Sequence, residues 1–228
     1  MKNTTNIAKA ILSLVAAFFI TGVCAAETST EQMEANNAEL TPLLLAARNG
    51  NLDTVKALID AGGNVNSPDK NGVTPLIFAS LNGNRDVVKL LLDHKADMKA
   101  RTKAGASPLD AASLEGRTGV VKLLLDRGAD PNTKNNKGGT PLHYAALKGN
   151  ADCAKLLIDK GAKVNVRDDN GETALSMAAG NGYLDLVKQL VESGADVTAK
   201  NNLGSTPLLI AISKKKSAVA EYLASLKR

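Results

Sequence analysis

The stretch Thr140-Pro141-Leu142-His143-Tyr144-Ala145-Ala146 decides the fold, because its pattern returns along the chain at a fixed interval. Thr-Pro-Leu recurs at three further places, and Ser-Pro-Leu and Thr-Ala-Leu fill the remaining gaps. The first residues of the six copies are Thr41, Thr74, Ser107, Thr140, Thr173 and Thr206, so every step is 33 residues. A constant period of this length predicts a stacked array, in which each unit buries its apolar face only against its neighbours.

Each unit opens with a pattern that is typical of a short helix. In the fourth unit, Thr140 can cap a helix that has Pro141 as its first residue. Leu142, Ala145 and Ala146 then fall three and four residues apart on one face. Glycine follows the first helix in five units, at Gly50, Gly83, Gly116, Gly149 and Gly182. These glycines predict where the first helix ends.

A second helix and a polar loop complete the unit. In the fourth copy we expect this helix from about residue 152 to 159, with Cys153, Leu156 and Leu157 on its apolar face. Glycine ends it in four copies, at Gly62, Gly128, Gly161 and Gly194, and Lys95 is the exception. Residues 163–172 are polar and contain the turn signal Asn170-Gly171.

The six-residue motif from Thr140 to Ala145 and the 33-residue period resemble the ankyrin repeat, whose signature is T-P-L-H-x-A. The resemblance covers residues 40–228. It implies an all-α ankyrin-repeat solenoid of six helix-turn-helix units with projecting β-turn loops. It also implies protein binding through the loop tips and the concave face. The sixth repeat departs from the pattern, because Lys215 stands where the glycine is expected. We interpret that repeat as a C-terminal cap with a polar outer side.

The first 26 residues have the layout of a secretory signal peptide. Lys2 and Lys9 precede an apolar run over residues 10–20, and the small residues Cys24-Ala25-Ala26 follow. We predict a signal peptide over residues 1–26, cleaved after Ala26 or, as the alternative, after Ala25. The apolar run has about half of the ~20 residues that a membrane-spanning helix needs.

Two other interpretations of this segment stay open. One is an uncleaved membrane anchor, and the other is a lipoprotein that carries its lipid on Cys24. The bulky Val23 before that cysteine argues against lipidation. After cleavage only Cys153 remains, and a single cysteine cannot form an internal disulfide.

Residues 27–39 are predicted to form an acidic polar linker, because they are rich in Glu, Ser, Thr, Gln and Asn. Loss of Lys2 and Lys9 lowers the formal net charge from +5 to +3. The linker holds four glutamates and no Lys or Arg, which leaves +7 on residues 40–228. Aromatic residues make up 3% of the chain and Trp is absent, which disfavours a wide aromatic-lined ligand pocket.

No pattern in the sequence predicts catalysis, a metal or a cofactor. His143 lies inside the repeat motif, where the resemblance implies a structural hydrogen bond between neighbouring turns. Cys153 takes a position that other copies fill with Val or Leu, which predicts a buried thiol. Asp168-Asp169-Asn170 lacks the rest of a calcium loop. The row Lys56, Lys89, Lys122, Lys155 and Lys188 has an acid four residues after each lysine, which predicts a solvated outer face.

The predicted partner-binding surface consists of an apolar row with basic residues around it. Leu81, Leu114 and Leu147 repeat at the 33-residue spacing and would form a stripe, with Phe78 and Tyr144 as aromatic anchors. The basic residues expected to flank the stripe are Arg101, Lys103, Lys134, Lys137 and Lys148. The predicted site also includes Arg48, which occupies the leucine position in the first repeat, and Lys70 at a loop tip. The alternative is that the leucines pack locally beneath the loops.

We therefore expect a non-enzymatic protein–protein interaction module or scaffold in the bacterial periplasm, monomeric and without stable membrane insertion after signal cleavage. Its partner would be a protein with an acidic surface, since the face is basic, and nucleic acid is not expected because an exported protein seldom meets it. The alternative is a secreted effector that binds proteins of another cell.

Overall fold

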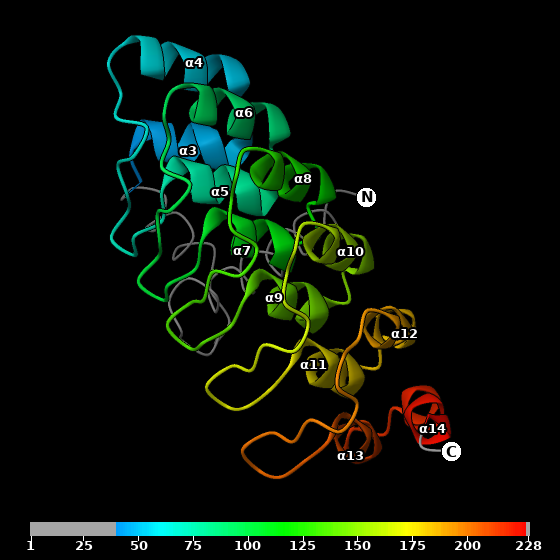
Figure 1. Cartoon of the computed structure of the whole chain (residues 1–228). Helices are drawn as coiled ribbons and strands as arrows, with labels where there is room; N and C mark the ends of the chain where they lie inside the picture. The colour runs from blue at the N-terminus through cyan, green and yellow to red at the C-terminus, as the bar shows by residue number, and fades with distance from the viewer. Residues whose placement is uncertain (1–39, 227–228) are drawn as a thin grey trace, which may run out of the picture. The chain divides into compact units, whose positions relative to one another are not determined.

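A computed structural model of the chain describes residues 40–226 (Figure 1). The predicted signal peptide over residues 1–26 and the predicted linker over residues 27–39 lie outside the described residues. The described residues divide into two compact units, residues 40–108 and residues 109–226. All regular secondary structure in the described part is α-helical, which confirms the predicted all-α class.

The first unit contains two helix pairs, which are α3 (Pro42–Asn49) with α4 (Leu52–Asp60) and α5 (Pro75–Asn82) with α6 (Arg85–Asp93). The helices of each pair pack on each other, α3 also packs on α5, and α4 packs on α6. We call the first helix of each pair the inner helix and the second the outer helix.

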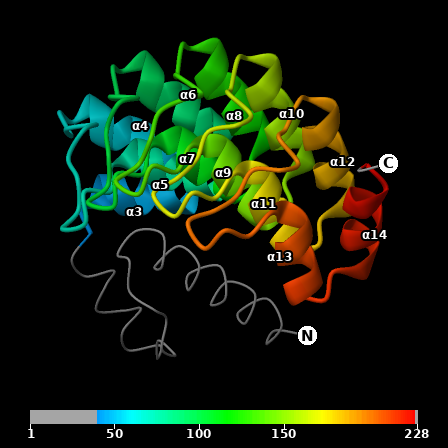
Figure 2. The same ribbon diagram turned by 60° about the horizontal axis from the view of Figure 1, so that its bottom comes forward.

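The second unit contains four pairs, in the same order of inner and outer helix. They are α7 (Pro108–Leu114) with α8 (Thr118–Asp126), α9 (Pro141–Lys148) with α10 (Ala151–Asp159), α11 (Ala174–Asn181) with α12 (Leu184–Glu192), and α13 (Pro207–Ser213) with α14 (Ser217–Ser225). Figure 2 shows α9, α11 and α13 in succession, and contacts join α9 to α11 and α11 to α13. The outer helices form the other layer, with α8 on α10, α10 on α12 and α12 on α14.

The inner helices begin where the sequence predicts. Thr74 has an extended backbone, and its hydroxyl accepts the N–H of Ile77 at 3.4 Å, with Pro75 as the first helical residue. Thr41 and Thr206 cap α3 and α13 in the same way. These caps satisfy backbone donors that the first turn leaves without a partner.

The inner helix α3 ends at a glycine for two separate reasons. Gly50 has a φ of 76°, in the left-handed region, where a side chain is unfavourable. A Cβ atom on Gly50 would also lie 2.7 Å from the side-chain oxygen of Asn84. Asn84 needs that approach because its amide donates to the carbonyls of Ala47 and Arg48, at 2.9 and 3.1 Å. In the second unit Asn150 repeats this arrangement over Gly116.

The buried side chains are mainly aliphatic. The largest fully buried side chains are mostly leucines, among them Leu44, Leu76, Leu91, Leu142 and Leu157. The small residues of the repeated Ala-Ala site are also fully buried or nearly so, which lets neighbouring inner helices approach closely.

The loops between the pairs are closed turns that are joined to one another. The side chain of Asp69 accepts the N–H groups of Asn71 and Val73, both at 2.8 Å. Asn135, Asp168 and Asn201 close the later loops in the same way. In addition, one backbone bond joins successive loops within each unit, such as that from the Asp169 N–H to the Lys137 carbonyl at 3.0 Å.

The sixth repeat corrects one expectation. The predicted polar outer side is wrong for α13, since Leu209 and Ile212 are 53% and 56% exposed. The same positions in α9, His143 and Ala146, are buried, because α9 packs on α11 as well as on α10. The lysines expected there occupy the turn after α13, where Lys215 adopts a φ of 57°.

Candidate partner-binding surface

The exposed side of α9 carries three of the predicted site residues. Tyr144, Leu147 and Lys148 lie three and four residues apart and therefore share one side of the helix. Leu147 is 40% exposed, Lys148 is exposed and Tyr144 is half-buried. We call Tyr144, Leu147 and Lys148, together with Lys134 and Lys137 of the preceding loop, the α9 surface.

Tyr144 joins this loop to the helix. Its hydroxyl oxygen accepts a hydrogen bond from the Asn135 side-chain amide, and Asn135 also accepts the N–H of Lys137 at 2.8 Å. Burial raises the pKa of Tyr144, the charge of Asp110 adds to the rise, and the bond from Asn135 opposes it. The phenol is therefore neutral at physiological pH. A fixed, partly exposed tyrosine of this kind suits an anchor in a protein interface.

The positive charge of the α9 surface is local. Lys134 and Lys137 are exposed on the loop before α9, and Lys148 is exposed at the end of the helix. The next loop contains Asp168 and the exposed Asp169 instead. The predicted basic rim is thus present around α9, and one repeat later the charge is mixed, because the exposed Arg167 stands beside Asp168 and Asp169.

Two further apolar residues, which are absent from the predicted site, extend the α9 surface. Met177 on α11 and Ile210 on α13 occupy the position of Tyr144 in the next two repeats, and both are half-buried. Their helices follow α9 in the layer of inner helices. The 33-residue spacing from Tyr144 was the signal that could have found them.

The predicted row of three exposed leucines is wrong at two positions. Leu81 and Leu114 are only 5% and 2% exposed, and Phe78 is buried as well. All residues of α5 from Pro75 to Leu81 are buried, and all of them except Ser80 are apolar. These side chains belong to the core, and only Leu147 of the row is accessible.

The first unit carries the remaining basic residues of the prediction. Lys70 and Lys103 lie on neighbouring loops, which the bond from the Lys103 N–H to the Asn71 carbonyl joins at 2.8 Å. Arg48, at the end of α3, is half-buried, and burial lowers its pKa. Arg101 donates to the carbonyls of Lys99 and Ala100, at 3.1 and 3.2 Å.

His143 has the structural role that the resemblance implies. Nδ1 of its ring lies 2.8 Å from the Thr140 hydroxyl and accepts the Thr140 N–H at 3.2 Å. Nε2 lies 3.2 Å from the carbonyl oxygen of Glu172, in the turn of the next repeat, and must donate to it. Burial is the main cause that lowers the pKa of His143, so the ring is neutral.

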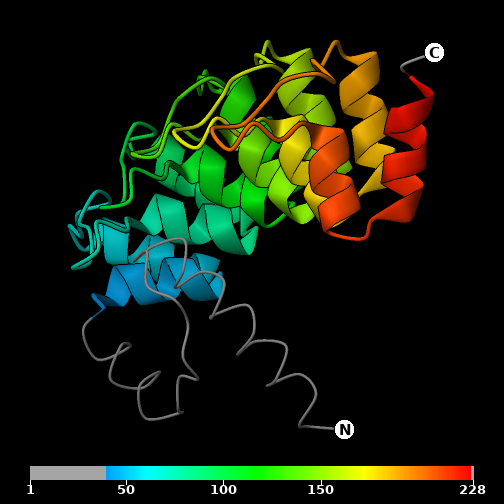
Figure 3. The same cartoon turned by 90° about the horizontal axis from the view of Figure 1, so that it is seen from below.

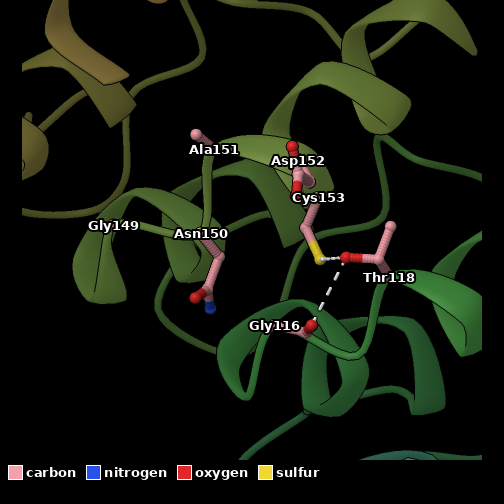
Figure 4. A pocket seen from close by; sticks show the side chains of 7 residues that line it. All are labelled: Gly116, Thr118, Gly149, Asn150, Ala151, Asp152 and Cys153. Carbon is pink, nitrogen blue, oxygen red and sulfur yellow. Dashed lines mark hydrogen bonds between the residues drawn. The ribbon is translucent and has the colours of Figure 1, made fainter. Parts of the chain in front are cut away.

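Cys153 lies in the core next to a pocket of about 300 Å³ (Figure 4). Its thiol is buried and lies 3.5 Å from the Thr118 hydroxyl, which in turn donates to the Gly116 carbonyl at 3.4 Å. Burial raises the pKa of Cys153, which disfavours the reactive thiolate. The prediction of a core cysteine is confirmed.

The outer helices form a charged face with ion pairs. Lys122 pairs with Asp126 at 2.5 Å and Lys155 with Asp159 at 3.9 Å, as the four-residue spacing predicts. Lys160 reaches Asp126 from the next repeat at 2.8 Å. Hydrogen bonds from Lys122 and Lys160 lower the pKa of Asp126 to about 2.

Residues 40–226 hold no group of three or more His, Cys, Asp or Glu side chains that is placed to bind a metal ion. No helix within the same range has the length and apolar character needed to cross a membrane.

Comparison with known families agrees with the helix pairs, the joined loops and the role of His143. The family model for ankyrin repeats, in three copies, matches the chain over residues 3–102, 43–135, 108–201 and 164–227. The chain therefore belongs to the ankyrin-repeat family, whose fold serves in general for protein–protein interaction. A comparison with curated proteins gives no match.

Proposed function

We propose that the chain is a non-enzymatic binding module that holds an acidic protein partner on the α9 surface. The observation that carries the proposal is the exposed Leu147 between Tyr144 and Lys148. An exposed apolar side chain next to a fixed aromatic one resembles the centre of an interface, and the lysines around it suit a polar rim. The residues that could do chemistry support a binding role, since the scaffold uses both His143 and Cys153.

The partner's charge follows from the rim. Lys134, Lys137 and Lys148 favour contact with carboxylates, while Asp168 and Asp169 in the next loop would repel them. We infer that the acidic part of the partner lies over α9 and its preceding loop. Met177 and Ile210 would extend the apolar contact beyond it.

We place this function in the bacterial periplasm. Support comes from Lys2 and Lys9, the apolar run over residues 10–20 and the small residues before the predicted cleavage site. A secreted effector that binds proteins of another cell is the alternative. Fractionation of cells and medium, with the N-terminal mass of the recovered chain, separates the two locations. Recovery of uncleaved chain in the cytoplasm would contradict both.

The binding surface is tested by photo-crosslinking in the native compartment. A crosslinking amino acid at Leu147 should capture one partner, and the same group at the exposed Lys155 of α10 should not. Purified partner should then bind the variant Leu147→Glu, Lys137→Glu at least about tenfold more weakly, because the change buries one charge and reverses another. The matched control is Leu52→Glu, Lys56→Glu on α4, since Leu52 is also 40% exposed. Equal affinity of both variants would exclude the α9 surface.

A further inference from the structure

The last helix pair leaves a row of apolar side chains exposed at the end of the second unit. Leu209 and Ile212 lie three residues apart and therefore share one side of α13. Leu203, in the loop before α13, is 89% exposed. In Figure 3, α13 (orange) and α14 (red) form the last pair of the chain. We call Leu203, Leu209 and Ile212 the α13 row.

The α13 row does not have the residues of a seam between repeats. Inner helices meet through small side chains, and Ala146 and Ala179 are fully buried at the position of Ile212. A β-branched side chain there would prevent the same close approach. At the position of Leu209 the third, fourth and fifth repeats have the polar residues Asp110, His143 and Ser176, whereas the second has the buried Ile77.

Exposed lysines precede and follow α13 along the chain. Lys200 is exposed in the loop that contains Leu203, and Lys214 and Lys215 are exposed directly after α13. Glu221 is the sole acidic residue among residues 197–226. Two copies docked through this face would bring their lysines together, and the mutual repulsion argues against self-association. The charge is complementary to an anionic surface instead.

We propose that this end of the molecule docks reversibly on membranes that contain anionic lipids, with the α13 row entering the interface. Apolar side chains and nearby lysines are the two signals that together hold a protein at such a surface. The leucines and the isoleucine would enter the boundary of the acyl chains, and the lysines would stay at the level of the phosphates. Each lysine near the surface raises the partition constant about fivefold.

A tryptophan reporter tests the contact directly, because the chain contains no Trp. In full-length Leu209→Trp, vesicles of equal parts phosphatidylglycerol and phosphatidylcholine should shift the emission to the blue. Brominated acyl chains in the same vesicles should quench it. Leu52→Trp on α4 is the matched control and should keep its emission. Each reporter senses its own surroundings, so vesicle binding through another part of the chain does not imitate the result.

Charge reversal in the Leu209→Trp protein tests the contribution of the lysines to vesicle binding. Lys200→Glu, Lys214→Glu should weaken vesicle binding by at least about twentyfold, since two attractive charges become repulsive. Lys56→Glu, Lys89→Glu on the outer helices of the first unit changes the net charge equally and should weaken it less than about threefold. Three results would overturn the proposal: no shift on the anionic vesicles, an equal shift on pure phosphatidylcholine, or a shift without vesicles that grows with protein concentration. The last would identify a second copy as the occupant.

Discussion

The fourth and sixth repeats share the same sequence pattern but differ at the positions that face the next repeat. His143, Ala146 and Gly149 in the fourth correspond to Leu209, Ile212 and Lys215 in the sixth. His143 and Ala146 are buried, and the ring of Tyr183 lies close to Gly149, whereas the three residues of the sixth repeat are exposed. The neighbouring repeat therefore requires a small residue at the position of Ala146 and a glycine at that of Gly149. Where the structure shows no neighbour, the same positions hold large apolar side chains and a strained lysine.

The largest expected difference between the two repeats concerns their leucines. Leu142 is fully buried in α9, and its counterpart Leu208 is half-buried in α13. Leu142→Ala should lower the free energy of unfolding by about 2–5 kcal/mol, because it leaves a cavity. Leu208→Ala should cost about 1 kcal/mol, since part of the side chain already meets water. Urea unfolding followed by circular dichroism measures both, and equal losses would contradict the comparison.

The second test exchanges the residues at the seam. Ala146→Ile should destabilise the protein by about 1–3 kcal/mol, because a fully buried site must accept three more carbon atoms. The reverse change in the sixth repeat, Ile212→Ala, should alter stability by less than about 0.5 kcal/mol. Thermal unfolding of the two variants beside the unchanged protein gives both values. A large loss for Ile212→Ala would mean that α13 has a partner in solution.

The third test concerns the end of the inner helix. Gly149 has a φ of 75°, and a Cβ atom there would lie 2.7 Å from the ring of Tyr183, so Gly149→Ala should cost about 1–2 kcal/mol. Lys215 adopts the same left-handed backbone without being glycine. Lys215→Gly should stabilise the protein by about 0.5–1 kcal/mol, as relief of strain exceeds the entropy cost of glycine. Lys216→Gly, at a residue with negative φ, is the control and should not stabilise.

The fold could be predicted from the sequence because the signals that fix it are local and repeated. Thr74 before Pro75 marks a helix start, and the glycines mark the ends, whatever lies around them. The roles of His143 and Cys153 could also be predicted, since the motif and the matching positions of other repeats define them.

The candidate site could be predicted only in part, because exposure depends on neighbours as well as on spacing. Leu81 and Leu147 occupy equivalent positions, yet the first is buried on an apolar helix and the second is accessible on an amphipathic one. The 33-residue period shows that both residues occupy equivalent positions of their repeats, but it carries no information on the residues that surround them. The same spacing indicates that Met177 and Ile210 correspond to Tyr144, but their partial exposure depends on the surrounding residues.

The smallest expected effect is a pH dependence of the free energy of unfolding. His143 causes it in the fourth repeat, and Leu209, which does not titrate, causes none in the sixth. Burial lowers the pKa of His143 below its ordinary value of 6.5, so the native protein holds the ring neutral while the unfolded chain binds a proton. The unfolded state is therefore favoured as pH falls, and the free energy of unfolding should decline below about pH 6.5, by at most about 1.4 kcal/mol per pH unit.

Urea midpoints between pH 8 and pH 5, for the unchanged protein and for His143→Ala, isolate this contribution. Asp126 does not interfere, because its pKa of about 2 lies below the window. The variant should be less stable at pH 8, where it lacks the bond to Glu172, and should lose less stability on acidification. Leu209→Ala serves as the control and should keep the pH dependence of the unchanged protein. If the urea midpoints of His143→Ala and of the unchanged protein changed with pH in parallel, the next repeat would not hold the ring neutral. The difference between the two repeats would then depend on packing alone.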